Sequence, residues 1–237
     1  MTDTQTAEFN SAAEFRDGVK DVLPVLVAIA PFGILFGAVA TKAGFSIFET
    51  LLSSALIVAG ASQFVMIDLL GQRMPYQSII IAVLAVNFRH VIYSASISRA
   101  MRLFSPLQKY SAFFILVDPT YAAAETRAEK RPLTAAYYFG YGLVMYATWN
   151  TTTLLGAIFG SFIDDPVKYG IDFILPLYFT GLVMGFRERR FFWQILTISG
   201  IAALAAHFTF GSPWNIAAGG VAGMLLAAVL SKPIEEA

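Results

Sequence analysis

The apolar run from Tyr76 to Ser98 carries the largest group of side chains that could do chemistry. Asn87 and His90 are three residues apart and share one face of a helix, while Arg89 and Tyr93 lie on the adjacent face. A guanidinium can bind an anion, and an imidazole can change its charge near neutral pH. These side chains predict a polar path or a substrate-contacting face. The alternative is that Arg89 extends to a polar interface and that His90 bonds a neighbouring helix.

A second candidate is the Gly-Ala-Ser-Gln sequence that begins at Gly60. Small residues in succession weaken a helix, and Ser62 could cap a new half-helix that runs from Gln63 to Leu70. The free N–H groups of that half-helix would suit a substrate carboxylate, with Gly60, Ser62 and Gln63 around it. A continuous helix with a small-residue notch is the alternative. Asp68, near the end of the same run, is a candidate for ion coupling or simply faces water.

Three further positions place polar or helix-breaking residues in apolar surroundings. Asp118 is followed by Pro119, which should disrupt the local helix. The carboxyl group of Asp118 either couples to proton movement or lies in an interfacial loop. Asn150 lies in the uncharged run 133–163 and either contacts substrate or ties helices together. Pro176 interrupts an apolar segment in the second half of the chain and predicts a second broken helix near the substrate.

The composition places all of these residues in a membrane protein. The chain has 237 residues, of which 57% are hydrophobic and 14% charged, and its mean hydropathy is +0.65. A soluble domain carries about a quarter charged residues. The 16 basic and 16 acidic residues balance, which excludes a basic nucleic-acid-binding surface. With no cysteine and two histidines, the chain predicts no disulfide, no metal centre and no cofactor.

Eight runs are long or apolar enough to be candidate spans, and seven of them are firm. They mix apolar residues without strict alternation, which favours helices over barrel strands. The runs are Val22–Thr41, Thr50–Leu70, Tyr76–Ser98, Ser111–Ala124, Leu133–Ile163, Phe173–Phe186, Phe191–Phe210 and Trp214–Leu230. The run Ser111–Ala124 is either a full span or a re-entrant segment. The sequence therefore predicts an all-α integral membrane protein, a bundle of seven or eight transmembrane helices.

The predicted organisation is a polar segment 1–20, one transmembrane domain 21–231 and a short tail 232–237. Interrupted helices at matching places predict two structural repeats, about 22–110 and 133–230. The repeats are parallel if Ser111–Ala124 spans the membrane and inverted if it does not. With eight spans, the excess of Lys and Arg lies on the side of the N-terminus, which predicts a cytoplasmic N-terminus. With Ser111–Ala124 re-entrant, the same count favours the opposite orientation.

Four pairs of glycines are spaced for close helix packing. In each pair the two glycines are four residues apart, so they lie one turn above each other on the same helix face. The pairs are Gly33/Gly37, Gly156/Gly160, Gly181/Gly185 and Gly219/Gly223. They predict a tightly packed bundle and name no function by themselves.

Two of these motifs resemble those of the AzlC family, the large subunits of bacterial branched-chain amino-acid exporters. They are Gly60–Phe64, which reads G-A-S-Q-F, and Asn87–Tyr93, which reads N-F-R-H-V-I-Y. The stretch Pro24–Gly37 is also similar, and the resemblance extends from about Phe15 to Leu230. The family usually has an Asp-Glu pair early in the fourth span, where this chain has Asp118 followed by proline.

The resemblance implies a secondary transporter of the bacterial inner membrane, surrounded by lipid, and not an enzyme. It implies export of valine, leucine, isoleucine or similar amino acids, driven by protons, together with a small multi-span partner of the AzlD type. In this reading Gln63 and Arg89 hold the substrate carboxylate, and Asp68 or Asp118 holds the ammonium group. His90 is the candidate for proton coupling.

Three alternatives remain at the level of the sequence. A channel or carrier for another small metabolite or ion could use the same scaffold. An intramembrane enzyme could use Asp68, His90 and Asp118 as acid–base groups, although the helical spacing gives no set of nucleophile, base and orienting group. A structural subunit that anchors the small partner would tolerate changes at Gln63, Arg89 and His90 together.

Overall fold

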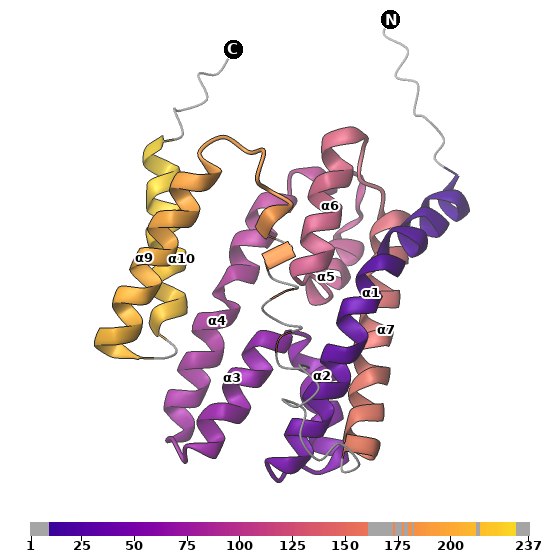
Figure 1. Cartoon of the computed structure of the whole chain (residues 1–237). Helices are drawn as coiled ribbons and strands as arrows, with labels where there is room; N and C mark the ends of the chain where they lie inside the picture. The colour runs from indigo at the N-terminus through magenta and orange to yellow at the C-terminus, as the bar shows by residue number, and fades with distance from the viewer. Residues whose placement is uncertain are drawn as a thin grey trace, which may run out of the picture. The chain divides into compact units, whose positions relative to one another are not determined.

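The computed structural model describes residues 10–160, 173, 177, 180–181, 183–211 and 214–230, and the regular structure in these ranges is helical throughout (Figure 1). The protein is therefore the all-α membrane protein that its sequence predicts. The described helices are α1 (Ser11–Lys42), α2 (Ile47–Ile57), α3 (Gly60–Gly71), α4 (Tyr76–Ile97), the 3₁₀ helix η1 (Ala100–Leu103), α5 (Pro106–Phe114), α6 (Asp118–Lys130), α7 (Ala135–Phe159), α9 (Phe192–Phe210) and α10 (Trp214–Leu230).

Three of the described helices are long and apolar enough to cross a membrane by themselves. They are α1, α4 and α9, with 32, 22 and 19 residues. The helix α2 and the segment Ala218–Leu230 are shorter apolar helices. Six of the fourteen residues of the candidate run Phe173–Phe186 lie outside the described residues. The total of seven or eight spans therefore stays a prediction.

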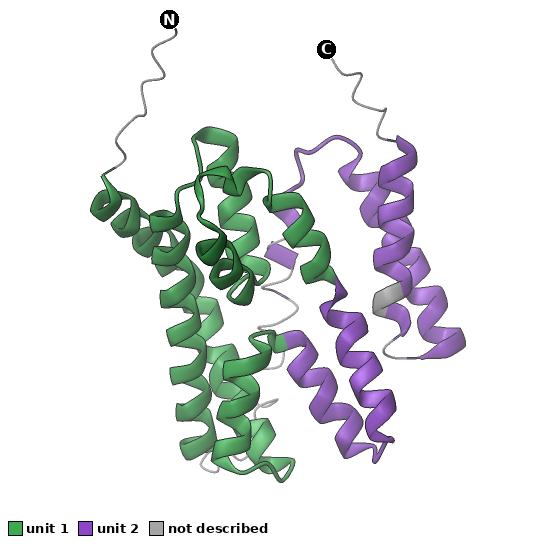
Figure 2. Ribbon diagram, turned by 180° about the vertical axis from the view of Figure 1, so that it is seen from behind, with its two compact units in different colours: residues 1–60, 89–175 green, residues 61–88, 176–237 purple. Residues whose placement is uncertain are grey.

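Contacts divide the chain into two compact units (Figure 2). The first unit consists of residues 1–60 and 89–175, and the second of residues 61–88 and 176–237. Each unit thus combines segments that are distant in the sequence, and α4 contributes to both. The predicted repeats stay a prediction.

In the described part of the second unit, α9 packs against α10. A Cβ on Gly219 would lie 2.9 Å from the Ser199 carbonyl oxygen, and Gly223 also faces Ser199. The close packing predicted for Gly219 and Gly223 is therefore confirmed. A smaller apolar cluster around Leu69 and Ile79 joins α3 to the beginning of α4.

The helices α1 and α7 form the main packing contact of the first unit and run parallel to each other. Gly18 faces Tyr137 near the start of both helices, and Gly37 faces Thr153 near their ends. Two of the four predicted glycine pairs meet in this contact, because a Cβ on any of their glycines would overlap the facing helix, whereas a Cβ on Gly181 of a third pair would meet no atom within 4 Å. The overlaps are Gly33 with Thr152, Gly37 with Thr153, Gly156 with Ile34, and Gly160 with Ala38. Their predicted role in close packing is confirmed.

The second candidate span is interrupted, but its second helix begins three residues earlier than predicted. The helix α2 ends at Ile57, Val58 adopts a left-handed conformation with φ of 47°, and α3 begins at Gly60. Ser62 is therefore not a cap, since it lies inside α3 with its side chain buried. The break falls where Gly60 packs against Trp149 of α7, and a Cβ at that position would contact the indole ring.

The fourth candidate span is not one helix. The helix α5 ends at Phe114 and α6 begins at Asp118, with Pro119 in its first turn. Pro119 therefore starts a helix and does not disrupt one, because the first turn needs no intrahelical N–H bond at that position. The helices α5 and α6 form a hairpin whose two ends both lie beside the start of α7. Ile115, at the tip of this hairpin, contacts Gly142, which lies two turns further along α7. The run Ser111–Ala124 is therefore two short helices and not one, which favours the re-entrant alternative; the re-entrant arrangement stays a prediction.

The starts of α1 and α7, the end of α4 and both ends of the α5–α6 hairpin gather at one end of the first unit. Ile97 at the end of α4 shares a buried cluster with Leu133 and Tyr138 near the start of α7. Basic residues concentrate at this end, and Lys42 lies at the opposite end of α1. They are Arg16, Lys20, Arg99, Arg102, Lys109, Arg127, Lys130 and Arg131. The sequence count had Arg99, Arg102 and Lys109 on the side opposite the N-terminus, whereas the structure places them at the same end, so the positive-inside rule favours a cytoplasmic N-terminus.

Replacing Gly156 by alanine should destabilise the protein, because the added Cβ would overlap the backbone of Ile34 on α1. Overpacking of this kind costs about 1–3 kcal/mol. We expect a lower melting temperature, measured by loss of the monodisperse gel-filtration peak of the detergent-purified protein after heating. Gly200→Ala in α9 is the matched control, since its Cβ meets no atom within 4 Å. Equal melting temperatures for the two variants would contradict the close packing of α1 on α7.

The re-entrant hairpin predicts which positions share one side of the membrane. The chain has no cysteine, so each single-cysteine variant reports one position. In intact cells, an impermeant maleimide should label Lys42→Cys but not Asn10→Cys, Arg102→Cys or Lys130→Cys, which should react only after permeabilisation. Labelling of Arg102→Cys and Lys130→Cys from opposite sides would show a full span between them and overturn the re-entrant arrangement.

Candidate functional site

An ion pair between α4 and α6 brings together three of the predicted site residues. Nη2 of Arg89 lies 3.1 Å from Oδ2 of Asp118, and the Tyr93 hydroxyl donates a hydrogen bond of 2.8 Å to Oδ1 of Asp118. Arg89 and Tyr93 are four residues apart on α4, so both face the start of α6. The side chains of Arg89 and Asp118 are 23% and 16% exposed, so this pair is mostly buried.

Two tyrosines clamp α4 to α6 beside the ion pair. The rings of Tyr93 and Tyr121 are stacked, with centroids 4.3 Å apart and an angle of 8° between their planes. The Tyr121 hydroxyl donates to Ser96 at 3.2 Å, and the Ser96 hydroxyl donates to Glu125 at 3.0 Å. Each helix thus has a tyrosine whose hydroxyl donates a hydrogen bond to a polar side chain of the other helix. The residues Tyr121, Ser96 and Glu125 were not among the predicted site residues.

Donor groups near the start of α6 exceed the acceptors that the structure provides for them. In the described part of the chain, Nε of Arg89 is buried and has no hydrogen-bond acceptor. The hydroxyl of Thr120 has no partner there either, although this residue is only 1% exposed. The cap residue Val117 makes no side-chain hydrogen bond to α6. A helix start carries free amides and a partial positive charge, so this region is suited to an anion next to the Asp118 carboxylate.

His90 lies at the edge of this cluster. Its ring meets the Tyr93 ring edge-on, with centroids 5.9 Å apart, so the imidazole is next to the hydroxyl that binds Asp118. Asn87 is half-buried one turn earlier on α4, in the part of the helix that belongs to the second unit. The roles predicted for His90 and Asn87 stay predictions.

The other predicted residues have different surroundings. Ser62 and Gln63 are fully buried in the first turns of α3. Asp68 is exposed near the end of α3, where its carboxylate accepts a hydrogen bond of 2.9 Å from Gln72. The Asn150 amide donates back to the Tyr146 carbonyl oxygen of its own helix at 2.9 Å. Its side chain also lines an apolar hollow between α2 and α7. Pro176 lies outside the described residues.

Both interrupted helices of the first unit meet α7 near its middle. Ile115 and Thr120, from the α5–α6 hairpin, contact the position of Gly142. The Tyr146 hydroxyl donates to the Ala55 carbonyl oxygen of α2 at 3.1 Å, and the Tyr146 ring lies 6.1 Å from the ring of Phe114 at the end of α5. The Tyr146 side chain therefore contacts both broken helices. Its sequence position, inside an ordinary apolar run, gave no signal of this contact.

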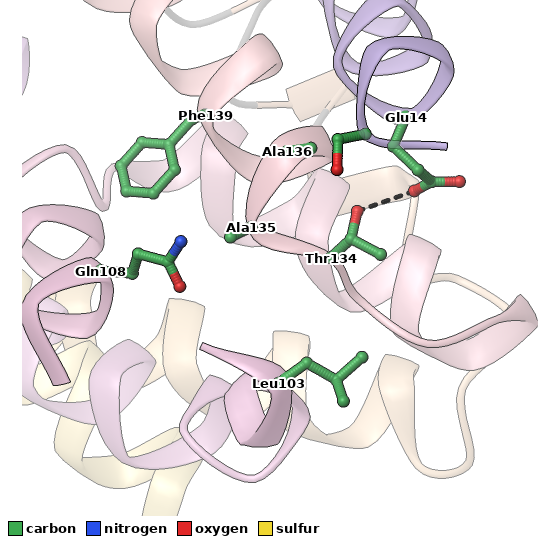
Figure 3. A pocket seen from close by; sticks show the side chains of 8 residues that line it. Glu14, Leu103, Gln108, Thr134, Ala135, Ala136 and Phe139 are labelled. Carbon is green, nitrogen blue, oxygen red and sulfur yellow. Dashed lines mark hydrogen bonds between the residues drawn. The ribbon is translucent and has the colours of Figure 1, made fainter. Parts of the chain in front are cut away.

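A cavity of about 490 Å³ lies at the starts of α1 and α7, outside the predicted site (Figure 3). Its walls combine polar and apolar side chains from α1, η1, α5 and α7. They are Ser11, Glu14, Leu103, Gln108, Thr134, Ala135, Ala136 and Phe139. The Thr134 hydroxyl, which caps α7, donates to Glu14 at 2.8 Å, as Figure 3 shows.

Glu14 belongs to a buried ion network that ties α1 to the end of α6. Arg127 Nη2 donates to the two carboxylate oxygens of Glu14 at 2.9 and 2.8 Å. The Arg127 guanidinium also lies 4.2 Å above the Tyr137 ring, and the Tyr137 hydroxyl donates to Asp21 at 2.8 Å. Because both charges of the central pair are matched, we interpret the network as structural.

Comparison with known proteins identifies the family. The sequence matches the model of the AzlC protein family over residues 24–163, which is more than half of the chain. This chain belongs to the AzlC family. The matched region includes the Arg89–Asp118 pair, the motif at Gly60 and the whole of α7, which ends at Phe159. The earlier resemblance is thereby confirmed.

This AzlC-family chain is similar to relatives that are named as membrane or transport proteins, and the similarity extends over nearly their whole length. The chain is 31% identical to the inner membrane protein YgaZ of Escherichia coli, with 92% of this chain and 91% of the relative covered. It is 32% identical to an uncharacterized membrane protein of Archaeoglobus fulgidus, covering 92% and 95%. It is 25% identical to the branched-chain amino acid transport protein AzlC of Bacillus subtilis, covering 95% and 88%. No solved structure matches the chain. The protein is a multi-pass inner-membrane protein.

Replacing Arg127 by methionine should destabilise the protein strongly, because Glu14 would remain buried without its partner. Removing one partner of a buried ion pair costs about 3–5 kcal/mol. Arg131→Met is the matched control, since the Arg131 side chain is 51% exposed and its ion pairs contribute about 0–1 kcal/mol. Melting temperatures of the purified variants test the difference. A drop of the same size for both variants would contradict the structural role of the buried pair.

Proposed function

We propose that this protein is the large subunit of a secondary transporter that exports branched-chain or other apolar amino acids from the cytoplasm. In this proposal the transporter exchanges them for protons and works with a small multi-span partner of the AzlD type. Membership of the AzlC family supports the proposal, as does the relative named as a branched-chain amino acid transport protein. The protein is then a carrier and not an enzyme.

The observation that carries the proposal is the Arg89–Asp118 pair at an interrupted helix. An amino acid has one negative and one positive group, and this pair offers the two opposite charges at 3.1 Å from each other. Arg89 keeps a buried donor that no acceptor among the described residues uses. Secondary transporters place their substrate sites at discontinuous helices of this kind. The start of α6 is therefore the best candidate for binding a zwitterion.

Proton exchange follows from the chemistry of Asp118. The ionised carboxylate binds the ammonium group of the substrate, and the protonated form does not, so substrate and proton exclude each other. A proton that arrives from outside the cell then releases the amino acid there, which gives export. Tyr93 holds the carboxyl group in place through its hydrogen bond. His90, beside Tyr93, is the second group of the site that can carry a proton.

The remaining residues of the proposal stay predicted contacts. Gly60, Ser62 and Gln63 form the first turn of α3, whose positive end attracts the carboxylate. Asn87, Asn150 and Pro176 are kept as substrate contacts, and Asp68 as the second candidate for ion coupling. The 21 phenylalanines of the chain provide apolar surface for a branched side chain.

Efflux from bacterial cells that lack their own exporters tests this function. Cells are loaded with leucine- or valine-containing dipeptides, and the chain is expressed alone and with a small multi-span protein encoded beside it. We expect faster efflux of branched-chain amino acids with both proteins, and loss of this efflux with a protonophore. Arg89→Ala should abolish the efflux, because the substrate carboxylate loses its guanidinium. Asp118→Asn should do the same, because the ammonium group loses its carboxylate.

Asp68→Asn is compared with Asp118→Asn, since both replace one carboxylate by an amide. Loss of efflux in the Asp118 variant alone assigns coupling to the start of α6, and loss in the Asp68 variant alone assigns it to the end of α3. Normal protein levels in the membrane are checked for every variant. Unchanged efflux in Arg89→Ala and Asp118→Asn, at wild-type protein level, would refute the proposed site. Absence of efflux for every apolar amino acid with both wild-type proteins present would refute the proposed function.

A further inference from the structure

A row of polar side chains follows the contact between α4 and α6, beyond the ion pair itself. Each helix contributes three side chains, spaced one turn apart, so that all of them face the other helix. They are Arg89, Tyr93 and Ser96 on α4, and Asp118, Tyr121 and Glu125 on α6. We call this row the polar seam. Polar side chains in a membrane-spanning helix are costly and usually mark a functional path.

The two stacked tyrosines divide the polar seam into two parts. The Tyr93 hydroxyl reaches Asp118, one turn before Tyr121 on α6, whereas the Tyr121 hydroxyl reaches Ser96, one turn after Tyr93 on α4. The two rings therefore point in opposite directions along the seam and overlap face to face, with centroids 4.3 Å apart. Rings in such contact leave no room for an amino acid between them. The stack thus separates the Asp118 carboxyl group from the Ser96 end of the seam.

Glu125 fixes the position of Tyr121 through the Ser96 hydroxyl. A serine hydroxyl has one proton to donate and lone pairs that accept. Ser96 donates its proton to Glu125 at 3.0 Å, so its oxygen is left to accept the hydrogen bond of 3.2 Å from Tyr121. The Glu125 carboxylate therefore sets the direction of this short chain of hydrogen bonds, which ends by holding the Tyr121 ring over that of Tyr93.

The Ser96 end of the seam lies toward the end of the first unit that the positive-inside rule assigns to the cytoplasm. Ser96 directly precedes Ile97, which belongs to the buried cluster at the start of α7. Glu125 is two residues before Arg127, which binds the start of α1. Ser96 is exposed, whereas the Asp118 side chain is 16% exposed. A substrate that is exported must reach Asp118 from this side.

We propose that Tyr121 closes the cytoplasmic side of the substrate site at Asp118 by stacking on Tyr93, and that Glu125 holds Tyr121 in this position through Ser96. Tyr121 and Glu125 are then positioning residues of the transporter and do not bind substrate themselves. This inference rests on the proposed function, because it requires a substrate that enters from the cytoplasm. The structure shows the closed arrangement.

Opening of this closure requires α4 and α6 to move apart. The helix α6 is tied to α1 by the Glu14–Arg127 ion pair, so α4 is the helix that moves. The movement breaks one ring stack and one hydrogen bond between the hydroxyls of Tyr121 and Ser96. Both are weak interactions, so the closure can form again in each transport cycle.

Labelling of Asp118→Cys in the cysteine-free chain measures access to the site. The chain is expressed with its partner, and inverted membrane vesicles are treated with an impermeant methanethiosulfonate, which reaches the cytoplasmic side. The reaction should be slow with Tyr121 present. In Tyr121→Ala it should be faster by about tenfold or more, as for loss of a ring stack and a hydrogen bond. Tyr121→Phe, which keeps the ring and loses the hydroxyl, should lie between the two.

Replacing Glu125 tests the positioning chain with both tyrosines in place. Glu125→Ala should also speed the labelling of Asp118→Cys, because the Ser96 hydroxyl is no longer directed. Glu125→Gln should have a smaller effect, because its amide oxygen still accepts the Ser96 proton. Equal labelling rates for Glu125, Glu125→Gln and Glu125→Ala would overturn the role of Glu125.

Two further cysteines control for general effects on the protein. Arg131→Cys, at a side chain that is 51% exposed, should react at the same rate with Tyr121 and with Tyr121→Ala. Thr153→Cys replaces a fully buried residue that contacts Ser54, and it should stay unreactive in both. Fast labelling of Asp118→Cys with both tyrosines present would show that the rings do not close the site. A gain in Tyr121→Ala that is as large at Thr153→Cys would show general loosening. Either result would overturn the proposal.

A cross-link tests whether the closure must open for transport. Ser96→Cys and Glu125→Cys are combined, and a short bis-methanethiosulfonate joins the two cysteines across α4 and α6. Leucine efflux should stop on cross-linking and return when a reductant cleaves the link. Each single-cysteine variant, treated in the same way, should keep its efflux. Efflux that continues at an unchanged rate in the fully cross-linked protein would overturn the proposal.

The outcomes separate this inference from the proposed function. Labelling needs no transport, so it decides the closure even if the wild-type complex transports no apolar amino acid and the proposed function fails. If the wild type exports leucine and Tyr121→Ala leaves the labelling of Asp118→Cys unchanged, the proposed function stands and the closure is refuted. If Tyr121→Ala does not reach the membrane, the comparison of Glu125→Ala with Glu125→Gln decides.

Discussion

The close contact between α1 and α7 is the constraint on which the rest of the first unit depends. In lipid, apolar helices gain little by burying apolar surface against each other, so packing and interhelical hydrogen bonds must hold them together. Glycines on both helices meet this need, because each lets the facing backbone approach where a Cβ would overlap it. The parallel direction of the pair also brings Glu14 to Thr134 and Arg127, and so sets where the α5–α6 hairpin is attached.

The interrupted helices explain why polar chemistry gathers near the middle of α7. A chain that leaves the helical conformation inside a membrane exposes backbone groups, and this is tolerated only where protein or a wet cavity surrounds them. The break after α2 is covered by Trp149, and the tip of the α5–α6 hairpin is covered by Gly142 and Tyr146. The same breaks provide helix starts whose positive ends are suited to a negatively charged group. The helix breaks thus account both for the packing around the middle of α7 and for the proposed binding of a charged group.

The sequence predicts those features that depend on neighbouring residues. The all-helical membrane fold, the glycine contacts and the shared direction of Arg89 and Tyr93 all follow from helical spacing. The Arg89–Asp118 pair does not, because 29 residues separate its members and no local pattern relates α4 to α6. The sequence predicts the break at Ser62 and not at Val58, because a β-branched residue rarely takes a left-handed conformation. Tyr121 and Tyr146 lie in the sequence like other aromatic residues of apolar runs, and only the structure shows which groups their hydroxyls bind.

The glycine-packed pair has a mechanical consequence. Two helices in such close contact over their whole length cannot slide or separate without losing many contacts at once, so they behave as one rigid body. Arg89 lies on α4, outside this pair, whereas Asp118 lies on α6, which the Glu14–Arg127 ion pair ties to α1. Any opening and closing of the first unit must therefore be carried by elements outside this pair. The guanidinium of Arg89 then belongs to an element that can move, while Trp149 and Tyr146 of α7 belong to the rigid pair.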